Sequence, residues 1–425
     1  MKIDNTDEYV MTLIMAAGKG TRMNSNKSKL IHKIYDKELV RRVVDLAKKI
    51  GSDEIVAVVG HLKEQVQEVL GDEVKYAFQD ELLGTGHAVM QAKPFLKGKK
   101  GKVVILYGDV PIIRPETLKN LISKSIKNKE YATLLTAIYE NPTGYGRIIR
   151  DEGGNIKGIV EEKDADPLQK KHIKEINSGI YCFDIEELLN AIDKIKPNNA
   201  QGEYYLTDVI KIMNDEGLKT GAVIVEDNTE ILGVNDRAQL ELLTRVLRMR
   251  INSYHMKKGV TIEDASTTYI YDDVKIGMDT VIHPNTIIKS GVTIGDNCEI
   301  GPNAYIREGC KIGNQVKVGN CVELKKVKIA DHTKVPHLTY LGDCEVGNNV
   351  NVGCGTITCN YDGKNKHKTK IGDNTFIGSN VNFVAPVKIG DDVIVAAGST
   401  ITEDVPDEKL VIARERQVIK EKKKK

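Results

Sequence analysis

The C-terminal part of the chain repeats with a period of six residues, and this period constrains the fold more than any other feature. An aliphatic residue returns at every sixth position from Ile276 to Leu324, and an apolar residue again returns at every sixth position from Ile371 to Ile401. A helix repeats about every 3.6 residues and a strand alternates, so neither element keeps such residues on one face. Short strands joined by tight turns do, because three hexads make one triangular coil with its apolar residues inside. The period therefore predicts a parallel β-helix, whose stacked coils bury a column that no single coil could bury.

Two polar stretches interrupt this repeat. We expect one inserted loop around Ala330 to Tyr340 and a second at CNYDGKNKHKTK, from Cys359 to Lys370. Both stretches are rich in Lys, His, Asn and Tyr, which a stacked core does not need. We therefore expect the two loops to carry chemistry.

The first half of the chain alternates between two patterns. Runs such as TLIMAAG and KVVILYGDV have the length and apolar character of buried parallel strands, and LVRRVVDLAKKIG has helical spacing closed by a glycine. This alternation predicts a doubly wound, Rossmann-like α/β sheet. GRIIRDEGGNIKGIVEE predicts a hairpin, so the sheet is expected to be mixed.

A helical segment separates the two halves. Leu240, Leu243, Leu247 and Ile251 fall at helical spacing, and Gly259 ends the pattern. We predict an α/β domain at residues 1–235, a linker helix at 236–258, and a parallel β-helix with a tail at 259–425. The predicted fold class is α/β followed by all-β.

Charge and cysteine content exclude several classes of protein. The net charge of the 425 residues is only +2, and positive and negative side chains are well mixed along the chain. We therefore expect neither nucleic acid nor a membrane surface as a partner. No apolar run approaches the length of a membrane span, and the opening MKIDNTDEYV does not look like a signal peptide. The seven cysteines are odd in number and form no CxxC pair, which is typical of reduced thiols. We expect a cytoplasmic protein.

The first predicted strand runs into AAGKGTRM, a stretch suited to binding an anion. Its glycines let the backbone approach a phosphate, and Arg22 and Lys29 add positive charge. By itself this signal is weak, because a glycine-rich strand-to-helix turn looks the same. LYGDVP strengthens it, since Asp109 falls just past a buried strand, at the edge where open α/β sheets bind ligands. A carboxylate near phosphates suits Mg²⁺.

Seven motifs carry a specific resemblance: LIMAAGKGTRM, GTGHAV, LYGDVP, NPTGYGRI, IVEEKDA, NAQGEYYLTD and HLTYLGD…TITCNYDG. Together and in this order, from about residue 11 to about residue 414, they resemble the family of bifunctional N-acetylglucosamine-1-phosphate uridyltransferases / glucosamine-1-phosphate N-acetyltransferases. The resemblance implies synthesis of UDP-N-acetylglucosamine, a precursor of peptidoglycan and lipopolysaccharide in bacterial cell envelopes. It also implies UTP and acetyl-CoA as co-substrates and Mg²⁺ as a cofactor.

The resemblance implies a uridyltransferase site in the first domain. Arg22 and Lys29 would be catalytic, because they would stabilise charge on the α-phosphate of UTP, and Asp109 and Asn235 would hold Mg²⁺. The attacking sugar phosphate is already ionised, so positioning and charge neutralisation would carry the rate. The residues that would bind UTP and the sugar nucleotide are Ala16, Ala17, Gly18, Gln79, Gly84, Thr85, Tyr107, Gly144, Glu161, Asn177 and Asn235.

The resemblance implies an acetyltransferase site in the β-helix. His337 would be the general base that takes a proton from the attacking amine. On residue type alone, a single histidine in a loop is more often structural. The acceptor sugar phosphate would be bound by Arg307, Lys325, Tyr340, Asn351 and Lys366, and acetyl-CoA by Cys354, Asn360, Tyr361, Ser379, Ala397 and Arg414.

Three residues depart from the family pattern. Ser28 replaces the usual proline before Lys29, so we expect altered loop order without loss of activity. Pro336 could shift His337, and Cys354 replaces a frequent alanine. The resemblance also implies a cyclic homotrimer with sites between subunits. Two alternatives remain, a monofunctional sugar-1-phosphate nucleotidyltransferase with a structural β-helix, and a purely structural or binding protein.

Overall fold

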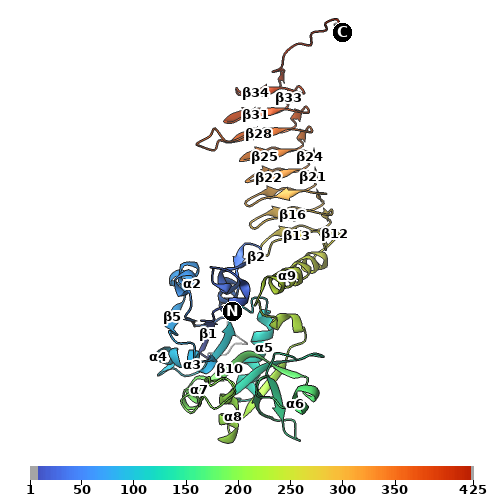
Figure 1. Ribbon diagram of the computed structural model, residues 1–425. Helices are drawn as coiled ribbons and strands as arrows, with labels where there is room; N and C mark the ends of the chain where they lie inside the picture. The colour runs from blue at the N-terminus through green and yellow to red at the C-terminus, as the bar shows by residue number, and fades with distance from the viewer. Residues whose placement is uncertain (1–7, 423–425) are drawn as a thin grey trace. The chain divides into compact units, whose positions relative to one another are not determined.

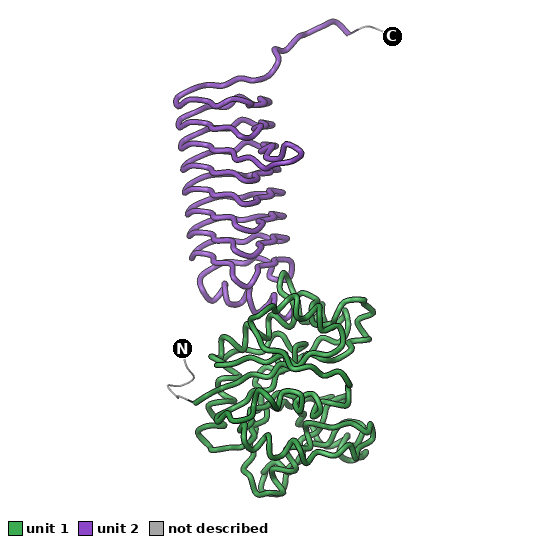
Figure 2. Tube along the Cα trace, turned by 90° about the vertical axis from the view of Figure 1, so that its left-hand side faces the viewer, with its two compact units in different colours: residues 1–244 green, residues 245–425 purple. Residues whose placement is uncertain are grey.

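The computed structural model describes residues 8–422. Residues 1–7, which belong to the segment predicted not to be a signal peptide, and residues 423–425 lie outside this range. The chain divides into two compact units, Met1–Thr244 and Arg245–Lys425 (Figure 2). The division falls inside helix α9 (Arg237–Lys257), which forms where the linker helix was predicted. The domain boundaries at 235 and 258 stay predictions.

A nine-stranded mixed sheet forms the centre of the first unit (Figure 1). Its main order is β11-β7-β10-β6-β1-β4-β5, in which β1 lies parallel to β4 and β6, and β10 lies antiparallel to β6 and β7. Strands β8 (Arg147–Arg150) and β9 (Ile156–Val160) form the predicted hairpin, which confirms a mixed sheet. The other bounds are β1 (Val10–Ala16), β4 (Glu54–Val59), β5 (Lys75–Phe78), β6 (Lys102–Tyr107), β7 (Ala132–Ile138), β10 (Glu175–Asp184) and β11 (Thr220–Ile224), with a separate pair β2 (Lys33–Ile34) and β3 (Lys37–Glu38).

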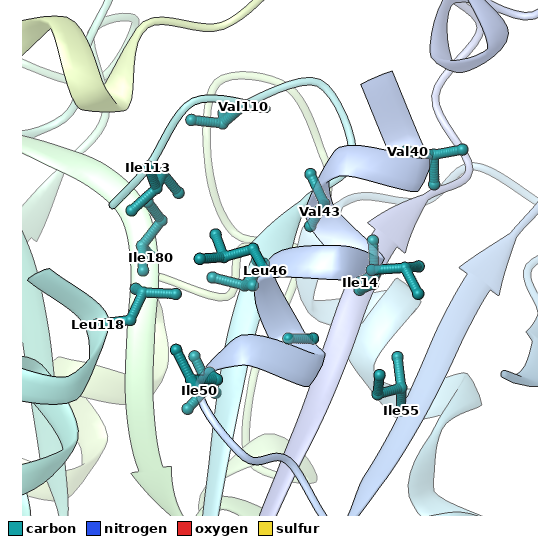
Figure 3. Packing of buried hydrophobic residues seen from close by; sticks show 14 of the residues in the cluster. Ile14, Val40, Val43, Leu46, Ile50, Ile55, Val110, Ile113, Leu118 and Ile180 are labelled. Carbon is teal, nitrogen blue, oxygen red and sulfur yellow. The ribbon is translucent and has the colours of Figure 1, made fainter. Parts of the chain in front are cut away.

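Helices cover both faces of this sheet, as a doubly wound fold requires. Alternate residues of β1 enter two separate cores, with Ile14 in one and Leu13 in the other. Figure 3 shows the first core, where Val40, Val43 and Leu46 of α1 pack against the sheet, with Ile50 directly after the helix. The helices are α1 (Leu39–Lys49), α2 (Lys63–Leu70), α3 (Thr85–Gln91), α4 (Lys93–Leu96), α5 (Pro115–Lys127), α6 (Pro167–His172), α7 (Ile185–Ile192) and α8 (Asp208–Asp215), with short 3-10 turns η2 (Thr21–Met23), η3 (Lys29–Ile31), η4 (Gly71–Glu73) and η5 (Asn228–Ile231).

The second unit is a parallel β-helix with three faces, each a sheet of stacked short strands. Face 1 contains β12 (Thr261–Ile262), β15 (Val281–Ile282), β18 (Glu299–Ile300), β21 (Lys317–Asn320), β24 (Lys334–His337), β27 (Asn351–Val352), β30 (Phe376–Ile377), β33 (Ile394–Val395) and β35 (Leu410–Val411). Face 2 contains β13 (Tyr269–Ile270), β16 (Ile287–Ile288), β19 (Tyr305–Ile306), β22 (Glu323–Lys325), β25 (Tyr340–Gly342), β28 (Ile357–Cys359), β31 (Asn382–Val384) and β34 (Thr400–Ile401). Face 3 contains β14 (Lys275–Ile276), β17 (Thr293–Ile294), β20 (Lys311–Ile312), β23 (Lys328–Ile329), β26 (Cys344–Val346), β29 (Thr369–Ile371) and β32 (Val387–Ile389).

The hexad residues point inward, as predicted. Ile282 and Ile300 on face 1 and Ile288 on face 2 are each 0% exposed. The residue directly before Ile288 or Ile300 is exposed, while Thr286 and Cys298, two positions before these isoleucines, are buried as well. Burial of the whole column stabilises coils that could not stand alone.

The prediction of an inserted loop around Ala330 to Tyr340 is wrong. Strands β23, β24 and β25 continue the stack through this segment without an insertion. Neighbouring coils are 17 residues apart here, as between Asn314 and Asp331, and 18 residues apart lower in the stack, as between Thr280 and Cys298. A turn one residue shorter shifts the phase of the repeat, and a shifted phase looks like an interruption in the sequence.

The second expected loop is present. It lies between β28 and β29, where the separation between coils rises to 25 residues, as between Asn348 and Asp373. Figures 1 and 2 show it projecting from the stack beside β28. Of the helices in the described part of the chain, none has the length and apolar character needed to cross a membrane.

Candidate active sites

The first candidate site is a cavity of about 330 Å³ in the first unit, at the carboxyl ends of β1 and β6. Open α/β sheets bind ligands at this edge. Nine residues predicted from the sequence line it: Ala16, Ala17, Gly18, Lys29, Gln79, Gly84, Thr85, Tyr107 and Asp109. Glu203 also lines it, and sequence reasoning named its motif but not its role.

Lys29 lies between the two predicted metal ligands. Its Nζ is 2.5 Å from Asp109 Oδ2 and 3.2 Å from Asn235 Oδ1. The Val234 amide donates to the Asp109 carbonyl at 2.9 Å, which fastens the Asn235 segment to the end of β6. Two converging oxygens suit Mg²⁺, which takes one or two protein ligands and completes its shell with water and phosphate. Within residues 8–422 no group of three or more His, Cys, Asp or Glu could form an all-protein metal cage.

The predicted sugar-binding residues lie beside Tyr107. Burial raises the pKa of Tyr107, and the charge of Glu161 raises it further, so this carboxylate and the ring are neighbours. Burial also raises the pKa of Glu161, although Thr207 Oγ1 donates a 3.2 Å hydrogen bond to it. Asn177 is buried and donates to the Tyr181 hydroxyl at 2.6 Å. Glu161 and Asn177 therefore lie next to the cavity without lining it.

Two predicted residues lie away from the cavity lining. Arg22 is exposed on η2, and Gly144 is exposed in the turn before β8 with φ near +89°. A positive φ of this size favours glycine, so a backbone requirement accounts for Gly144. The structure brings neither residue to the cavity wall.

Ser28 restrains the backbone before Lys29. Its amide donates to Gln65 Oε1 at 2.7 Å, and its hydroxyl accepts from the Leu30 amide at 3.4 Å. A proline would have no amide hydrogen to donate and would restrain the chain through its ring. The two hydrogen bonds of Ser28 thus restrain the backbone before Lys29, as the fixed φ angle of a proline would in the family pattern.

The second candidate site begins with three cations beside face 2. Arg307 and Lys325 occupy equivalent positions in adjacent coils, where the Arg307 amide donates to the Leu324 carbonyl at 2.8 Å. Lys366 reaches them from the projecting loop, and its ammonium lowers the pKa of Lys325. Arg307 also pairs with Glu323 at 3.0 Å. The three predicted phosphate ligands therefore gather at one turn of the β-helix, the turn that follows face 2.

His337 and Tyr340 lie on the other side of face 2. His337 is exposed at the end of β24, directly after Pro336, and a two-residue turn leads to Tyr340 at the start of β25. Asn360 is buried, and its Nδ2 donates to Asp343 Oδ2 at 2.6 Å. Sequence reasoning missed Asp343, because only the fold places it against Asn360. Tyr361 is exposed and donates to the Gly363 carbonyl at 2.6 Å within its own loop.

Four of the six predicted acetyl-CoA residues, Cys354, Ser379, Ala397 and Arg414, form a column along the turns that follow face 1, whereas Asn360 and Tyr361 follow β28 on face 2. The Asn380 amide donates to the Cys354 carbonyl, the Gly398 amide to the Ser379 carbonyl, and Arg414 to the Ala397 carbonyl, at 2.7, 2.8 and 2.6 Å. One coil below, the Gly355 amide donates to the Leu338 carbonyl, so His337 lies at the foot of this column. Asn351, which was predicted to bind the acceptor sugar phosphate, lies in β27 on face 1, whereas Tyr340, predicted for the same ligand, lies on face 2.

The fold and the two sites define a class, a nucleotidyltransferase joined to a hexapeptide-repeat transferase. The family model for nucleotidyl transferase matches residues 11–244, and the model for bacterial transferase hexapeptide (six repeats) matches residues 368–403. A model for the GMPPB C-terminal domain matches residues 282–362. The second unit is thus a left-handed β-helix of hexapeptide repeats.

The chain belongs to the family of the bifunctional protein GlmU. It is 50% identical to that protein of Acetivibrio thermocellus, 52% to that of Caldanaerobacter subterraneus subsp. tengcongensis, and 51% to that of Thermoanaerobacter pseudethanolicus. Each alignment spans 447 residues and covers 97% of this chain and 97% of the relative. The predicted family is confirmed, and the chain is a bifunctional enzyme. The roles of individual residues stay predictions.

Proposed function

We propose that the chain catalyses two successive steps in the formation of UDP-N-acetylglucosamine. The β-helix domain, residues 259–425, acetylates glucosamine 1-phosphate with acetyl-CoA. The first domain, residues 1–235, transfers UMP from UTP to N-acetylglucosamine 1-phosphate and releases pyrophosphate. One observation supports this pairing above others: each unit gathers cations around a site suited to a phosphate, Lys29 in the first and Arg307, Lys325 and Lys366 in the second.

In the uridyltransferase site the sugar phosphate attacks the α-phosphate of UTP in line. The attacking oxygen is already ionised, which agrees with a cavity that contains no histidine among its lining residues. Lys29 neutralises charge on the phosphates, and Gln79, Gly84 and Thr85 hold the base. Arg22 is proposed to act with Lys29, although it lies outside the cavity wall on η2. Asp109 and Asn235 would hold Mg²⁺, which when bound neutralises charge on the triphosphate.

In the acetyltransferase site the amine of glucosamine 1-phosphate attacks the thioester carbonyl of acetyl-CoA. His337 accepts the proton that the amine must lose, and coenzyme A leaves as its thiolate. The position of His337 supports this role, because it lies at the foot of the column from Cys354 to Arg414, across face 2 from the cation cluster. Asn360, held by Asp343, is suited to stabilise the oxyanion.

A cyclic homotrimer completes the proposed site. Asn351 and Tyr340 are both predicted to bind the acceptor, yet they lie on different faces of one β-helix, and a second copy would bring face 1 against face 2. Face 1 also exposes a row of apolar side chains, Phe376, Ile394 and Leu410, each more than half exposed. Such a row is typical of a surface that another chain covers. We place the enzyme in the cytoplasm, where UTP and acetyl-CoA are made.

The first experiment measures the two activities separately. Purified chain is incubated with glucosamine 1-phosphate and acetyl-CoA without UTP, and free thiol is followed beside the His337→Ala variant. We expect thiol release that the variant loses, and pyrophosphate release from UTP and N-acetylglucosamine 1-phosphate by both proteins. Pyrophosphate without any thiol release would establish the monofunctional alternative, in which the β-helix is only structural.

A further inference from the structure

Gln79 is held at the cavity wall by two contacts of its side-chain amide. The residue follows β5, is 3% exposed, and lines the cavity. Its Nε2 lies 3.1 Å from the Gly84 carbonyl oxygen and 3.2 Å from His87 Nδ1. His87 belongs to α3, does not line the cavity, and has no role in the proposed mechanism.

These contacts settle which way the Gln79 amide points. A carbonyl oxygen only accepts hydrogen bonds, so the group that faces Gly84 must be the NH₂ of Gln79. The second hydrogen of this NH₂ points to His87 Nδ1, which must then be the acceptor. The neutral imidazole therefore carries its proton on Nε2.

The second neighbour of the His87 ring is the side-chain amide of Gln91. The Gln91 amide lies 3.1 Å from His87 Nε2, so it must present its oxygen to that N–H. Turning the Gln91 amide in this way gives up a 3.3 Å hydrogen bond from its nitrogen to the His87 carbonyl and brings its oxygen toward that carbonyl, but Gln91 is only half-buried, so its side chain can shift. Turning Gln79 instead would set its oxygen against the Gly84 carbonyl oxygen, two acceptors 3.1 Å apart. A proton on Nε2 is thus the arrangement that keeps both contacts of the buried Gln79 amide and requires only the half-buried Gln91 to adjust.

The same orientation leaves Gln79 Oε1 as an acceptor. Among residues 8–422 no donor makes a hydrogen bond to this oxygen, and it is not sealed from solvent. Uracil presents an N–H at N3, which such an oxygen can accept, whereas cytosine presents a lone pair at the same position. A site built to hydrogen-bond one base disfavours an analogue that leaves its buried polar group unpaired.

We propose that His87 is a positioning residue that holds the Gln79 amide with its oxygen toward the base, and so sets the preference of this site for uracil over cytosine. This inference rests on the proposed uridyltransferase function. His87 itself touches neither nucleotide nor sugar and acts only through Gln79.

Two kinds of substitution at His87 separate positioning from general structure. His87→Leu removes the acceptor at Nδ1, while His87→Asn places an amide oxygen near the same point. We expect the ratio of Kd for CTP to Kd for UTP to fall about tenfold in His87→Leu, the effect of losing one of two hydrogen bonds on the amide. His87→Asn should keep a ratio close to that of the unmodified chain. His87→Phe, which retains a ring, provides a second apolar variant should His87→Leu fold poorly.

Binding of UTP and CTP to the full chain is measured by titration calorimetry, and pyrophosphate release is measured in parallel. A purely structural role would weaken both nucleotides equally, so an unchanged ratio in the apolar variants would overturn the proposal. An Asn variant no more selective than the Leu variant would also overturn it. Absence of pyrophosphate release from the unmodified chain would refute the proposed function alone, because the ratio of dissociation constants still tests His87.

Discussion

The stability of the β-helix should depend on one asparagine in α9. Asn252 is 0% exposed, and its Nδ2 donates 2.9 Å hydrogen bonds to the carbonyl oxygens of Ala265 and Thr268 in the first coil. Asn252→Ala removes both donors. The Thr268 bond is buried, so its loss costs about 1–3 kcal/mol, while water can replace the half-buried Ala265 bond at about 0.5–1.5 kcal/mol. Asn252 Oδ1 is buried without a hydrogen-bond partner in the described residues, and its removal offsets part of this cost.

We therefore expect Asn252→Ala to lower the free energy of unfolding of the second unit by about 2 kcal/mol. Asn252→Asp should cost more, because a carboxylate cannot donate and would place charge beside two carbonyl oxygens. The loss of thiol-release activity with urea reports on this unit, and the loss of pyrophosphate release reports on the first. Lys257→Ala, an exposed change on the same helix, is the control. Asn252→Ala and Asn252→Asp variants as stable as the control would refute the reasoning.

Three further predictions concern the sites. His337→Ala should lower kcat for thiol release by about 10²–10⁴-fold, the usual contribution of a general base, and leave pyrophosphate release unchanged; equal loss of both activities would point to unfolding. Asp109→Asn should lower pyrophosphate release by about 10²–10³-fold and raise the Mg²⁺ concentration needed for half-maximal rate, while thiol release stays constant. Lys366 lowers the pKa of Lys325, so Lys325 loses its proton at a lower pH than an isolated lysine would. KM for glucosamine 1-phosphate should therefore begin to rise at that lower pH. Lys366→Met should raise the pKa of Lys325 and move that rise to higher pH, although binding at neutral pH is weaker; a pH profile of KM that does not move would contradict this.

Most of the architecture could be predicted because it depends on local patterns. The period of six predicts inward side chains without knowledge of any contact, and Ile282, Ile288 and Ile300 are fully buried accordingly. The alternation of apolar and amphipathic runs likewise predicts strands covered by helices on both sides. Asp109 could be placed at a binding edge from its position after an apolar run, because parallel strands end at the same edge of a sheet.

The absent loop shows where local patterns fail. Between Leu324 and Ile329 the apolar residues are five apart, and the sequence shows only that the phase is broken. Whether a broken phase marks an inserted loop or a shorter turn depends on how one coil stacks on the next. Lys326 and Asp343 in the shorter turns have left-handed backbone, with φ near 51° and 49°, but so does Gly309 in an ordinary turn, so the local conformation does not distinguish the two lengths.

The sequence by itself determined the two fold classes, the helix between them and the residues that the family pattern marks as functional. Only the tertiary structure decided which of these residues meet. Lys325 and Lys366 are far apart in the chain, yet stacking of the coils and the path of the projecting loop set their charges side by side. The same stacking puts Asn351 and Tyr340 on different faces. Periodicity reports which way a side chain points, whereas proximity between distant segments depends on the closure of every turn that lies between them.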